Sequence, residues 1–194
     1  MESDEILNHS YNTDTKFLRI NSSREEGIET IDVSYQKIHE GLAYTFVCDK
    51  SSLDNGDSFW IMFKTNSVKN VHFRPALLFT TDSLVVGKLY ESPTFTEGTG
   101  SSVNVYNHNR NIVDSDNSDV VIMLEPENLT EGTRLPLTVF AGVEGSRQSQ
   151  SGGFRSSEEE WILKSDTLYG IKVENIGSSS TDVTVIPFWY EVEY

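Results

Sequence analysis

Four histidines are the residues that could activate a nucleophile, because a catalytic Ser or Cys needs a histidine, an orienting acid and an oxyanion hole. They are His9, His39, His72 and His108. None lies in a Gly-x-Ser-x-Gly elbow, and the chain also has no Gly-x-x-x-x-Gly-Lys-Ser/Thr phosphate loop. His72 alternates with apolar neighbours, so we expect it to point outward from a strand. The sequence therefore predicts no catalytic residue and no cofactor.

One acidic stretch has the ligand spacing of a metal site. Residues 114–119 read Asp-Ser-Asp-Asn-Ser-Asp, like the start of a calcium loop, and Glu125 stands where a bidentate ligand would follow. Asp119 replaces the glycine that makes the sharp turn, and residues 120–124 read as a strand. The pattern therefore favours a solvated acidic turn, with Asp114, Asp116 and Glu125 as the candidate ligands of the alternative.

The acidic and aromatic residues also fit a protein that cleaves or binds carbohydrate. Glycosidases use two carboxylates, but among 30 Asp and Glu residues some pair meets the required distance by chance. The acidic run 158–160 beside Trp161 fits catalytic acids next to an aromatic surface for a sugar ring. More typically, such a run is a charged strand entrance, that is, a charged segment where a strand begins. Trp60, Trp161 and Trp189 each lie in an apolar segment, so we expect core or sheet-face packing, with a lectin-like face as the alternative.

Two loops keep arginine without any acid in an otherwise acidic chain. Residues 104–111 (NVYNHNRN) carry one arginine, and residues 145–157 (GSRQSQSGGFRSS) carry two arginines and three glycines. Such cationic islands suit an acidic partner surface, and the alternative is a pair of flexible polar loops. The candidate partner-binding residues are Asn109, Arg110, Asn111, Arg147, Gly152, Gly153 and Arg155.

The elements that must position these residues read as short strands separated by turn residues. We expect strands over 31–36, 42–48, 58–64, 71–79, 84–90, 103–106, 120–124, 135–143, 161–163, 168–173 and 183–192. Pro75 indicates an edge or a bulge, and an apparent change of apolar face across Pro187 indicates a bulge or a corner. No window has a convincing helical period, so the sequence predicts an all-β fold, a single sandwich of jelly-roll or Greek-key, Ig-like type.

The chain divides into an arm and one domain. Residues 1–27 are mostly Asn, Ser, Thr, Asp and Glu around the apolar residues Phe17, Leu18 and Ile20. This composition predicts an extended N-terminal arm, flexible or docked on a partner. Residues 28–194 are enough for one hydrophobic core, so we expect a single sandwich domain there.

Charge and composition exclude several functions. The chain has 15 Lys and Arg against 30 Asp and Glu, for a net charge of −15, and its basic residues are scattered from Lys16 to Lys172. This balance argues against nucleic acid and against a membrane surface, and no segment has the roughly 20 apolar residues that cross a bilayer. The N-terminus lacks the features of a secretory signal peptide, and the lone Cys48 has no disulfide partner, so we expect folding in a reducing cytoplasm.

Five short motifs, in this order, resemble those of a known family. They are Ile38-His39-Glu40-Gly41, Asn109-Arg110-Asn111, Gly152-Gly153-Phe154-Arg155, Glu160-Trp161-Ile162-Leu163-Lys164 and Trp189-Tyr190-Glu191. From about residue 28 to residue 194, the chain resembles the capsid auxiliary, or decoration, head proteins of tailed bacteriophages, including crAss-like gut phages. It departs from them after Asn111, where residues 112–119 are acidic instead of rich in Ser and Thr.

The resemblance implies a non-enzymatic structural protein of the virion, which decorates and cements the outer surface of the capsid. Its partners would be the major capsid protein and neighbouring copies of itself, in a homo-oligomer for which we expect a trimer. It would be made in the host bacterial cytoplasm. The alternative is a head- or tail-fibre module that binds host-surface glycan, and a glycan-cleaving enzyme comes third.

Overall fold

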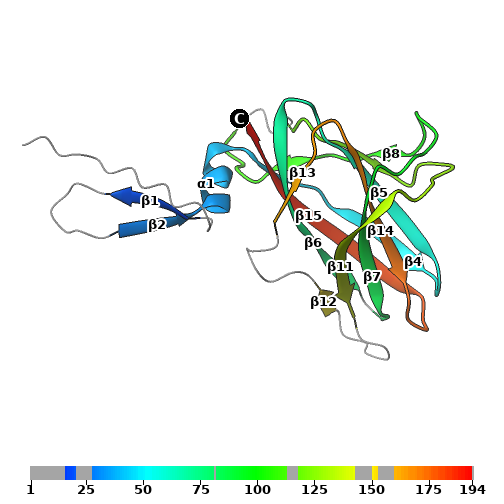
Figure 1. Cartoon of the computed structure of the whole chain (residues 1–194). Coiled ribbons are helices and arrows are strands. Elements are labelled where there is room, and N and C mark those ends of the chain that lie inside the picture. The colour runs from blue at the N-terminus through cyan, green and yellow to red at the C-terminus, as the bar shows by residue number, and fades with distance from the viewer. Residues whose placement is uncertain are drawn as a thin grey trace, which may run out of the picture.

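The computed structural model describes residues 16–20, 28–80, 82–112, 118–142, 150–152 and 160–193. They form mostly strands, in two antiparallel sheets, with one short helix, so the predicted all-β sandwich is confirmed (Figure 1). None of the helices in these ranges is long and apolar enough to span a membrane.

One sheet has six strands in the order β11-β7-β14-β5-β10-β8. Its strands are β5 (Ser58–Lys64), β7 (Val85–Glu91), β8 (Ser101–Ser102), β10 (Val121–Leu124), β11 (Thr133–Ala141) and β14 (Leu168–Asn175). The other sheet has seven strands in the order β12-β6-β15-β3-β9, with β13 also beside β6 and β4 also beside β15. Its strands are β3 (Ala43–Thr45), β4 (Cys48–Leu53), β6 (Lys69–Thr80), β9 (Tyr106–Asn107), β12 (Gln150–Gly152), β13 (Trp161–Leu163) and β15 (Thr181–Glu193).

Two prolines meet at a bulge in the centre of the seven-stranded sheet. Ile186 pairs with Leu77 and Phe188 with Arg74, so Pro187 lies opposite two residues of β6, one of which is Pro75. Of the predicted alternatives, an edge or a bulge at Pro75 and a bulge or a corner at Pro187, the bulge is therefore confirmed for both. Because the extra residue belongs to β6, β15 keeps its alternation.

The predicted change of face along β15 is wrong. Val183, Val185 and Trp189 all belong to the core, before and after the bulge. Phe188 and Tyr190 instead lie on the outer face of the sheet, because alternate residues of a strand point to opposite sides. Their burial comes from other side chains that cover this outer face.

The core fills the space between the sheets with aliphatic and aromatic side chains. The Phe63 ring stacks on Phe73 of the opposite sheet and on Tyr169, with centroid distances of 5.2 and 5.5 Å. Trp189 is core, as expected, and Trp161 packs against the core from one edge. Trp60 points to the outer face of β5, because the residues that flank it, Phe59 and Ile61, are in the core.

A helix replaces part of the strand predicted over 31–36. β2 (Ile28–Asp32) ends there, and α1 (Val33–Glu40) begins directly after it. The Asp32 side chain caps the helix by accepting from the backbone N–H of Ser34 at 2.8 Å. Gly41 ends it in the left-handed conformation, at φ 74°, where a Cβ would overlap the Ile112 side chain. These caps outweigh the β-propensity of Val33 and Tyr35.

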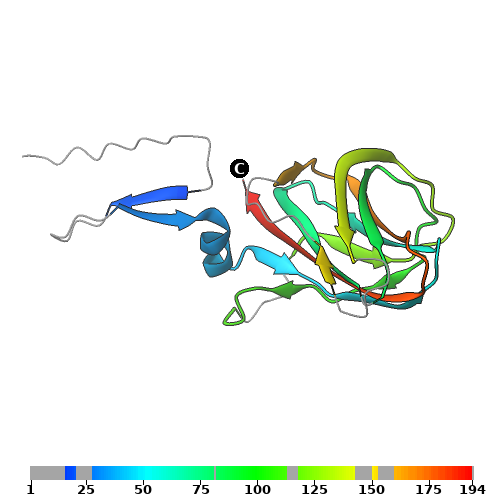
Figure 2. The ribbon, with the colours of Figure 1, turned by 90° about the horizontal axis from the view of Figure 1, so that it is seen from below.

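The strands before α1 form a hairpin of their own. β1 (Lys16–Ile20) pairs with β2 in antiparallel register, and neither strand joins the two sheets, whose first strand is β3. In both Figure 1 and Figure 2 the hairpin projects beyond the sandwich, to which it is joined through α1. The rest of the predicted arm, residues 1–15 and 21–27, lies outside the described residues.

The core position of Cys48 yields a chemical prediction. The side chain is 4% exposed, and burial, reinforced by the charges of Asp49 and Glu125, raises the pKa of the thiol to about 11. In the native protein at pH 8 we expect Cys48 to react with Ellman's reagent at least about 100-fold more slowly than an exposed thiol. Ser51→Cys, at an exposed position of β4, supplies that reference. Fast reaction of Cys48 in the folded wild type would contradict its core placement.

Candidate partner-binding interface

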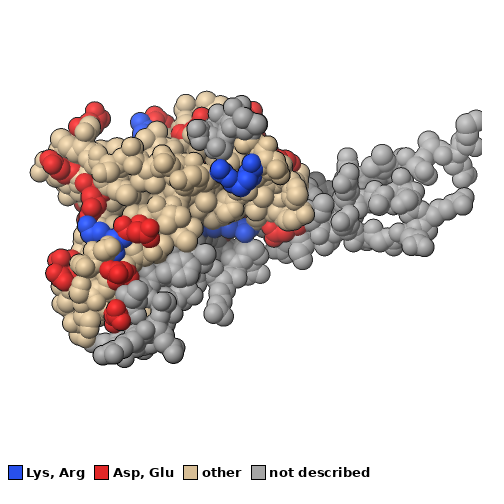
Figure 3. Space-filling model, turned by 180° about the vertical axis from the view of Figure 1, so that it is seen from behind, with Lys and Arg blue, Asp and Glu red and all other residues tan. Residues whose placement is uncertain are grey.

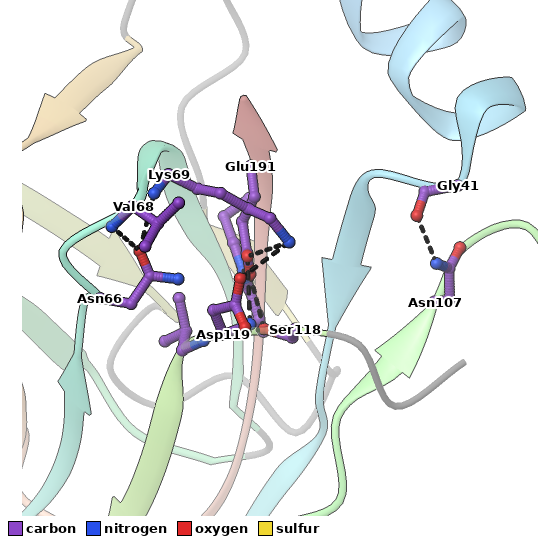
Figure 4. A network of polar contacts seen from close by, with 10 residues as sticks. Gly41, Asn66, Val68, Lys69, Asn107, Ser118, Asp119 and Glu191 are labelled. Atoms are coloured by element: carbon purple, nitrogen blue, oxygen red, sulfur yellow. Dashed lines mark hydrogen bonds and ion pairs between the residues drawn. The ribbon is translucent and has the colours of Figure 1, made fainter. Parts of the chain in front are cut away.

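The Asn-Arg-Asn loop closes the carboxyl end of α1. Asn107 is 1% exposed, and its Nδ2 donates to the Gly41 carbonyl at 2.6 Å (Figure 4). Asn109 Nδ2 donates to the His39 carbonyl at 3.0 Å, while its Oδ1 accepts from the Asn111 N–H at 3.1 Å. The last carbonyls of a helix have no partner inside the helix, and these amides supply one. Asn109, a predicted partner-binding residue, therefore uses its side chain within the molecule.

Arg110 and Asn111 are the exposed residues of this loop. The Arg110 guanidinium lies over the Tyr106 ring, with Cζ 5.8 Å from the ring centroid, and Tyr106 is itself 45% exposed. A cation over an aromatic face is held in place without losing its outward hydrogen-bond donors. The pair is accessible to a partner protein.

Cross-strand pairing places Tyr106 at one end of a row of residues that crosses four strands. Tyr106 of β9 pairs with Thr45 of β3, Thr45 with Phe188 of β15, and Phe188 with Arg74 of β6. Arg110 and Arg74 therefore stand at the two ends of an uncharged row.

The next residues along two of these strands widen the row into a patch. Phe46 and Cys48 are core residues, so Val47 points outward, as does Ile186 next to core residue Val185. We call the set the uncharged patch; its members are Thr45, Val47, Tyr106, Ile186 and Phe188. Figure 3 views the molecule from this side, with a broad uncharged area in the middle and several of the coloured acidic side chains at the left.

Phe188 is held between a histidine and an arginine. The His108 ring meets it edge-on at a centroid distance of 5.0 Å, and Arg74 Cζ lies 5.7 Å from its centroid. Burial lowers the pKa of His108, so this imidazole is neutral at neutral pH. Arg74 also lies 3.6 Å from a Glu160 oxygen, which offsets its charge, so the exposed positive charge at the patch belongs to Arg110.

Glu160 ties the segment before β13 to the outer face of β6 and β15. Tyr190 Oη donates to its two carboxylate oxygens at 2.7 and 2.8 Å, and His72 Nδ1 lies 2.7 Å from Oε1. The His72 and Tyr190 rings stack at 4.6 Å, and Arg74 Nε lies 3.6 Å from Oε2. His72 thus points outward from β6, as predicted.

The environment of Glu160 keeps this carboxylate ionised. Burial raises its pKa, but hydrogen bonds from His72 and Tyr190, with the charges of His72 and Arg74, hold the pKa below its ordinary value. Both oxygens have protein partners, so this acid serves as an anchor. Glu160 directly precedes β13, as expected for a charged strand entrance, and its side chain is mostly buried; residues 158 and 159 lie outside the described ranges.

A second carboxylate, Glu191, is fully buried on the core side of β15. It accepts hydrogen bonds from Trp189 Nε1 at 3.1 Å, Ser118 Oγ at 2.7 Å and the Asp119 N–H at 3.1 Å (Figure 4). Lys69 Nζ lies 3.8 Å from Glu191 and 2.8 Å from Asp119, and its pKa is raised by its hydrogen bond to Asp119 and by both acids. The network anchors the segment that leads into β10.

Several predicted residues lie outside this interface or outside the described residues. Gly152 ends β12, where it pairs with Leu78, but Arg147, Gly153 and Arg155 are not described. The same holds for the candidate calcium ligands Asp114 and Asp116.

The third candidate calcium ligand is described. Glu125 Oε1 lies 2.6 Å from Lys50 Nζ, as an ion pair. Within the described ranges, no group of three or more His, Cys, Asp or Glu residues is placed to hold a metal ion.

Sequence reasoning missed Arg74, Tyr106 and Phe188, which reach the interface through pairing of strands far apart in the chain. The available signal was the alternation of His72 and Arg74 with core residues. Comparison with protein-family models, curated proteins and solved structures finds no match.

Removal of the Glu160 charge should destabilise the fold. We expect Glu160→Gln to lower the free energy of unfolding at pH 7 by about 1–3 kcal/mol, the cost of losing hydrogen bonds to a charged group. A carboxylate whose pKa is lowered on folding stabilises the fold above its unfolded pKa, and this stabilisation is lost as pH falls. Wild type should therefore lose more stability than the variant as pH falls below 4.5, the ordinary value.

Urea unfolding of both proteins between pH 7 and pH 3 measures this difference. Glu97→Gln, at an exposed turn, is the matched control and should behave as wild type. Parallel pH profiles for wild type and Glu160→Gln would contradict the anchoring role.

Asn107→Ala should loosen α1 from the sandwich. The change leaves the Gly41 carbonyl and the Asn109 N–H without their buried partner, at a cost of about 1–3 kcal/mol. Relative to wild type, amide hydrogen exchange in the variant should become faster in residues 33–40 and stay unchanged in β14. Asn111→Ala, which removes an exposed side chain, should change neither region.

Proposed function

We propose that the chain is a non-enzymatic structural protein of a tailed-phage virion, which decorates the outer capsid surface and cements neighbouring capsomers. The observation that carries the proposal is the uncharged patch, with an arginine at each end, in a chain of net charge −15. The resemblance of the five sequence motifs to capsid auxiliary proteins supports the same role.

The interface suits a protein partner that carries carboxylates. Tyr106 and Val47 are 45% and 47% exposed, which gives the patch apolar area to bury. Arg110 supplies forked donors that match a carboxylate, and its charge opposes the charge of an acidic partner surface. Many copies bound side by side on one shell make individually weak contacts cumulative.

The carboxylates on this sheet support a structural role over a catalytic one. Glu160 and Glu191 each have both oxygens in contact with donors of the protein itself. A general acid or base needs an oxygen open to the substrate. Neither group has that arrangement.

The end of the sandwich away from the hairpin suits the solvent side. The turns at residues 54–57 and 175–182 meet there, through a hydrogen bond from the Gly56 N–H to the Asn175 carbonyl at 2.9 Å. The first turn carries the exposed acids Asp54 and Asp57, and the exposed Asp182 follows the second turn at the start of β15. We propose that this acidic end faces away from the shell.

A second candidate function is the binding of host-surface glycan, and one observation favours it. The Trp60 ring lies over Gly170, where an added Cβ would come within 3.1 Å of it, and 5.1 Å from the Tyr90 ring. Lys172, which forms an ion pair with Glu131, lies over the same ring, with Nζ 5.8 Å from the ring centroid. An aromatic surface beside charged groups suits a sugar ring. A glycan array with wild type and Trp60→Phe tests it; binding that only wild type shows would favour this candidate.

Cosedimentation with phage heads that lack the protein tests the first proposal. Wild type should sediment with the heads, and Arg110→Glu should bind at least about tenfold more weakly, because it places an acid against an acidic partner. Arg134→Glu makes the same charge change at an exposed position of β11, in the other sheet, and should bind as wild type. Wild type that stays in the supernatant would overturn the proposal.

A further inference from the structure

Lys69 lies beside two carboxylates at one end of the sandwich. Its Nζ is 2.8 Å from Asp119 Oδ2 and 3.8 Å from Glu191 Oε2 (Figure 4). Within the described ranges, each of the other lysines that form ion pairs contacts a single carboxylate. The Lys69 side chain is mostly buried and that of Glu191 is fully buried, so this amine is held in place with little access to water.

The three side chains come from three strands or their borders, in both sheets. Lys69 begins β6, on the same side of the strand as the core residues Val71 and Phe73. Glu191 belongs to the neighbouring strand β15, and Asp119 lies two residues before β10 of the six-stranded sheet. A covalent bond between Lys69 and Asp119 would therefore join the two sheets.

We propose that Lys69 and Asp119 condense into an intramolecular isopeptide bond, with Glu191 carrying a proton between the reacting atoms. An amine held against a carboxyl group reacts at an effective concentration far above that of the same groups in solution. Glu191 Oε2 accepts from the Asp119 N–H at 3.1 Å, which keeps this oxygen next to both reacting residues. Glu191 is closed to an outside substrate, but here both reacting groups belong to the chain itself and react once.

The reaction converts an ammonium and a carboxylate into an amide and one water molecule. One proton passes from Lys69 Nζ to Asp119 Oδ2, which gives a neutral amine and a neutral acid. The nitrogen lone pair then forms the Nζ–Cγ bond, and Glu191 accepts a second proton from Nζ and gives it to the leaving oxygen. The Cγ–O bond breaks and water leaves through the exposed part of the Asp119 side chain. The third proton stays on the amide nitrogen, and Glu191 ends as the carboxylate that it was.

The two acids also slow this reaction. The hydrogen bond to Asp119 and the charges of both acids raise the pKa of Lys69, so the ammonium form predominates. The neutral amine and acid together carry the same number of protons as the ion pair, so their population does not depend on pH between the two pKa values. We therefore expect slow formation of the bond after folding, at neutral pH.

The crosslink goes beyond the proposed function and does not depend on it. It closes a loop of the chain between residues 69 and 119, which restricts the unfolded state in the way that a disulfide does. The bond is measured on the isolated protein, so its absence would leave the cosedimentation with heads unaffected.

The intact mass of the full-length protein under denaturing conditions tests the bond. Wild type should be lighter than its sequence by one water molecule, whereas Lys69→Arg keeps the positive charge and should have its full sequence mass. Trypsin should leave Lys69 uncleaved and release it in a branched product with the peptide that contains Asp119. Lys50, which lies 2.6 Å from Glu125 alone, is the internal control and should be cleaved as a free lysine. Wild type with its full mass and with cleavage at Lys69 would overturn the proposal.

Glu191→Gln tests the proton transfer. The amide keeps the size of the side chain but cannot carry the proton, so the crosslinked fraction should fall at least about tenfold. Glu125→Gln removes an exposed acid and should crosslink as wild type. Full crosslinking of Glu191→Gln would overturn the role of Glu191, and the mass of wild type decides the bond itself even if this variant does not fold.

Discussion

The pairing of β6 with β15 is the interaction on which the rest of the structure depends. These are the two longest strands, and they pair along nearly their whole length, from Val183 with Thr80 to Glu193 with Lys69. Shorter strands occupy their free edges, β12 and β13 on β6, and β3 and β4 on β15. The bulge at Pro75 and Pro187 lies between two neighbouring strands on each side, β12 and β13 beside β6, and β3 and β4 beside β15. Neither proline is therefore opposite an edge strand that needs its backbone N–H.

The two carboxylates near one end of this pair act on opposite faces of the sheet. Glu191 holds the segment before β10 on the core side, and Glu160 holds the segment before β13 on the outer side. An ionised carboxylate that leaves water loses solvation energy, and the donors that surround each one offset that loss. β15 is therefore buried on both faces at residues 189–191, while residues 181–188 alternate between buried and less buried positions.

The strands and the sandwich were predictable because alternation and turn residues are local signals. Ser58–Lys64 and Trp161–Leu163 were predicted with their observed bounds. α1 was not predicted, because its stability comes from the caps at Asp32 and Gly41 more than from periodicity. Arg110 was correctly expected at the surface, whereas the internal role of Asn109 depends on a carbonyl 70 residues away in the chain. The partners of Glu160 lie 88 and 30 residues away, a distance at which sequence pattern carries no information.

The loop that caps α1 also presents Arg110, so one short segment serves the helix end and the exposed cation together. Asn107 and Asn109 fix the helix end from the residues on either side of His108, and Arg110 follows directly. A change in the backbone of residues 107–110 would therefore alter the end of α1 and the position of the Arg110 guanidinium together.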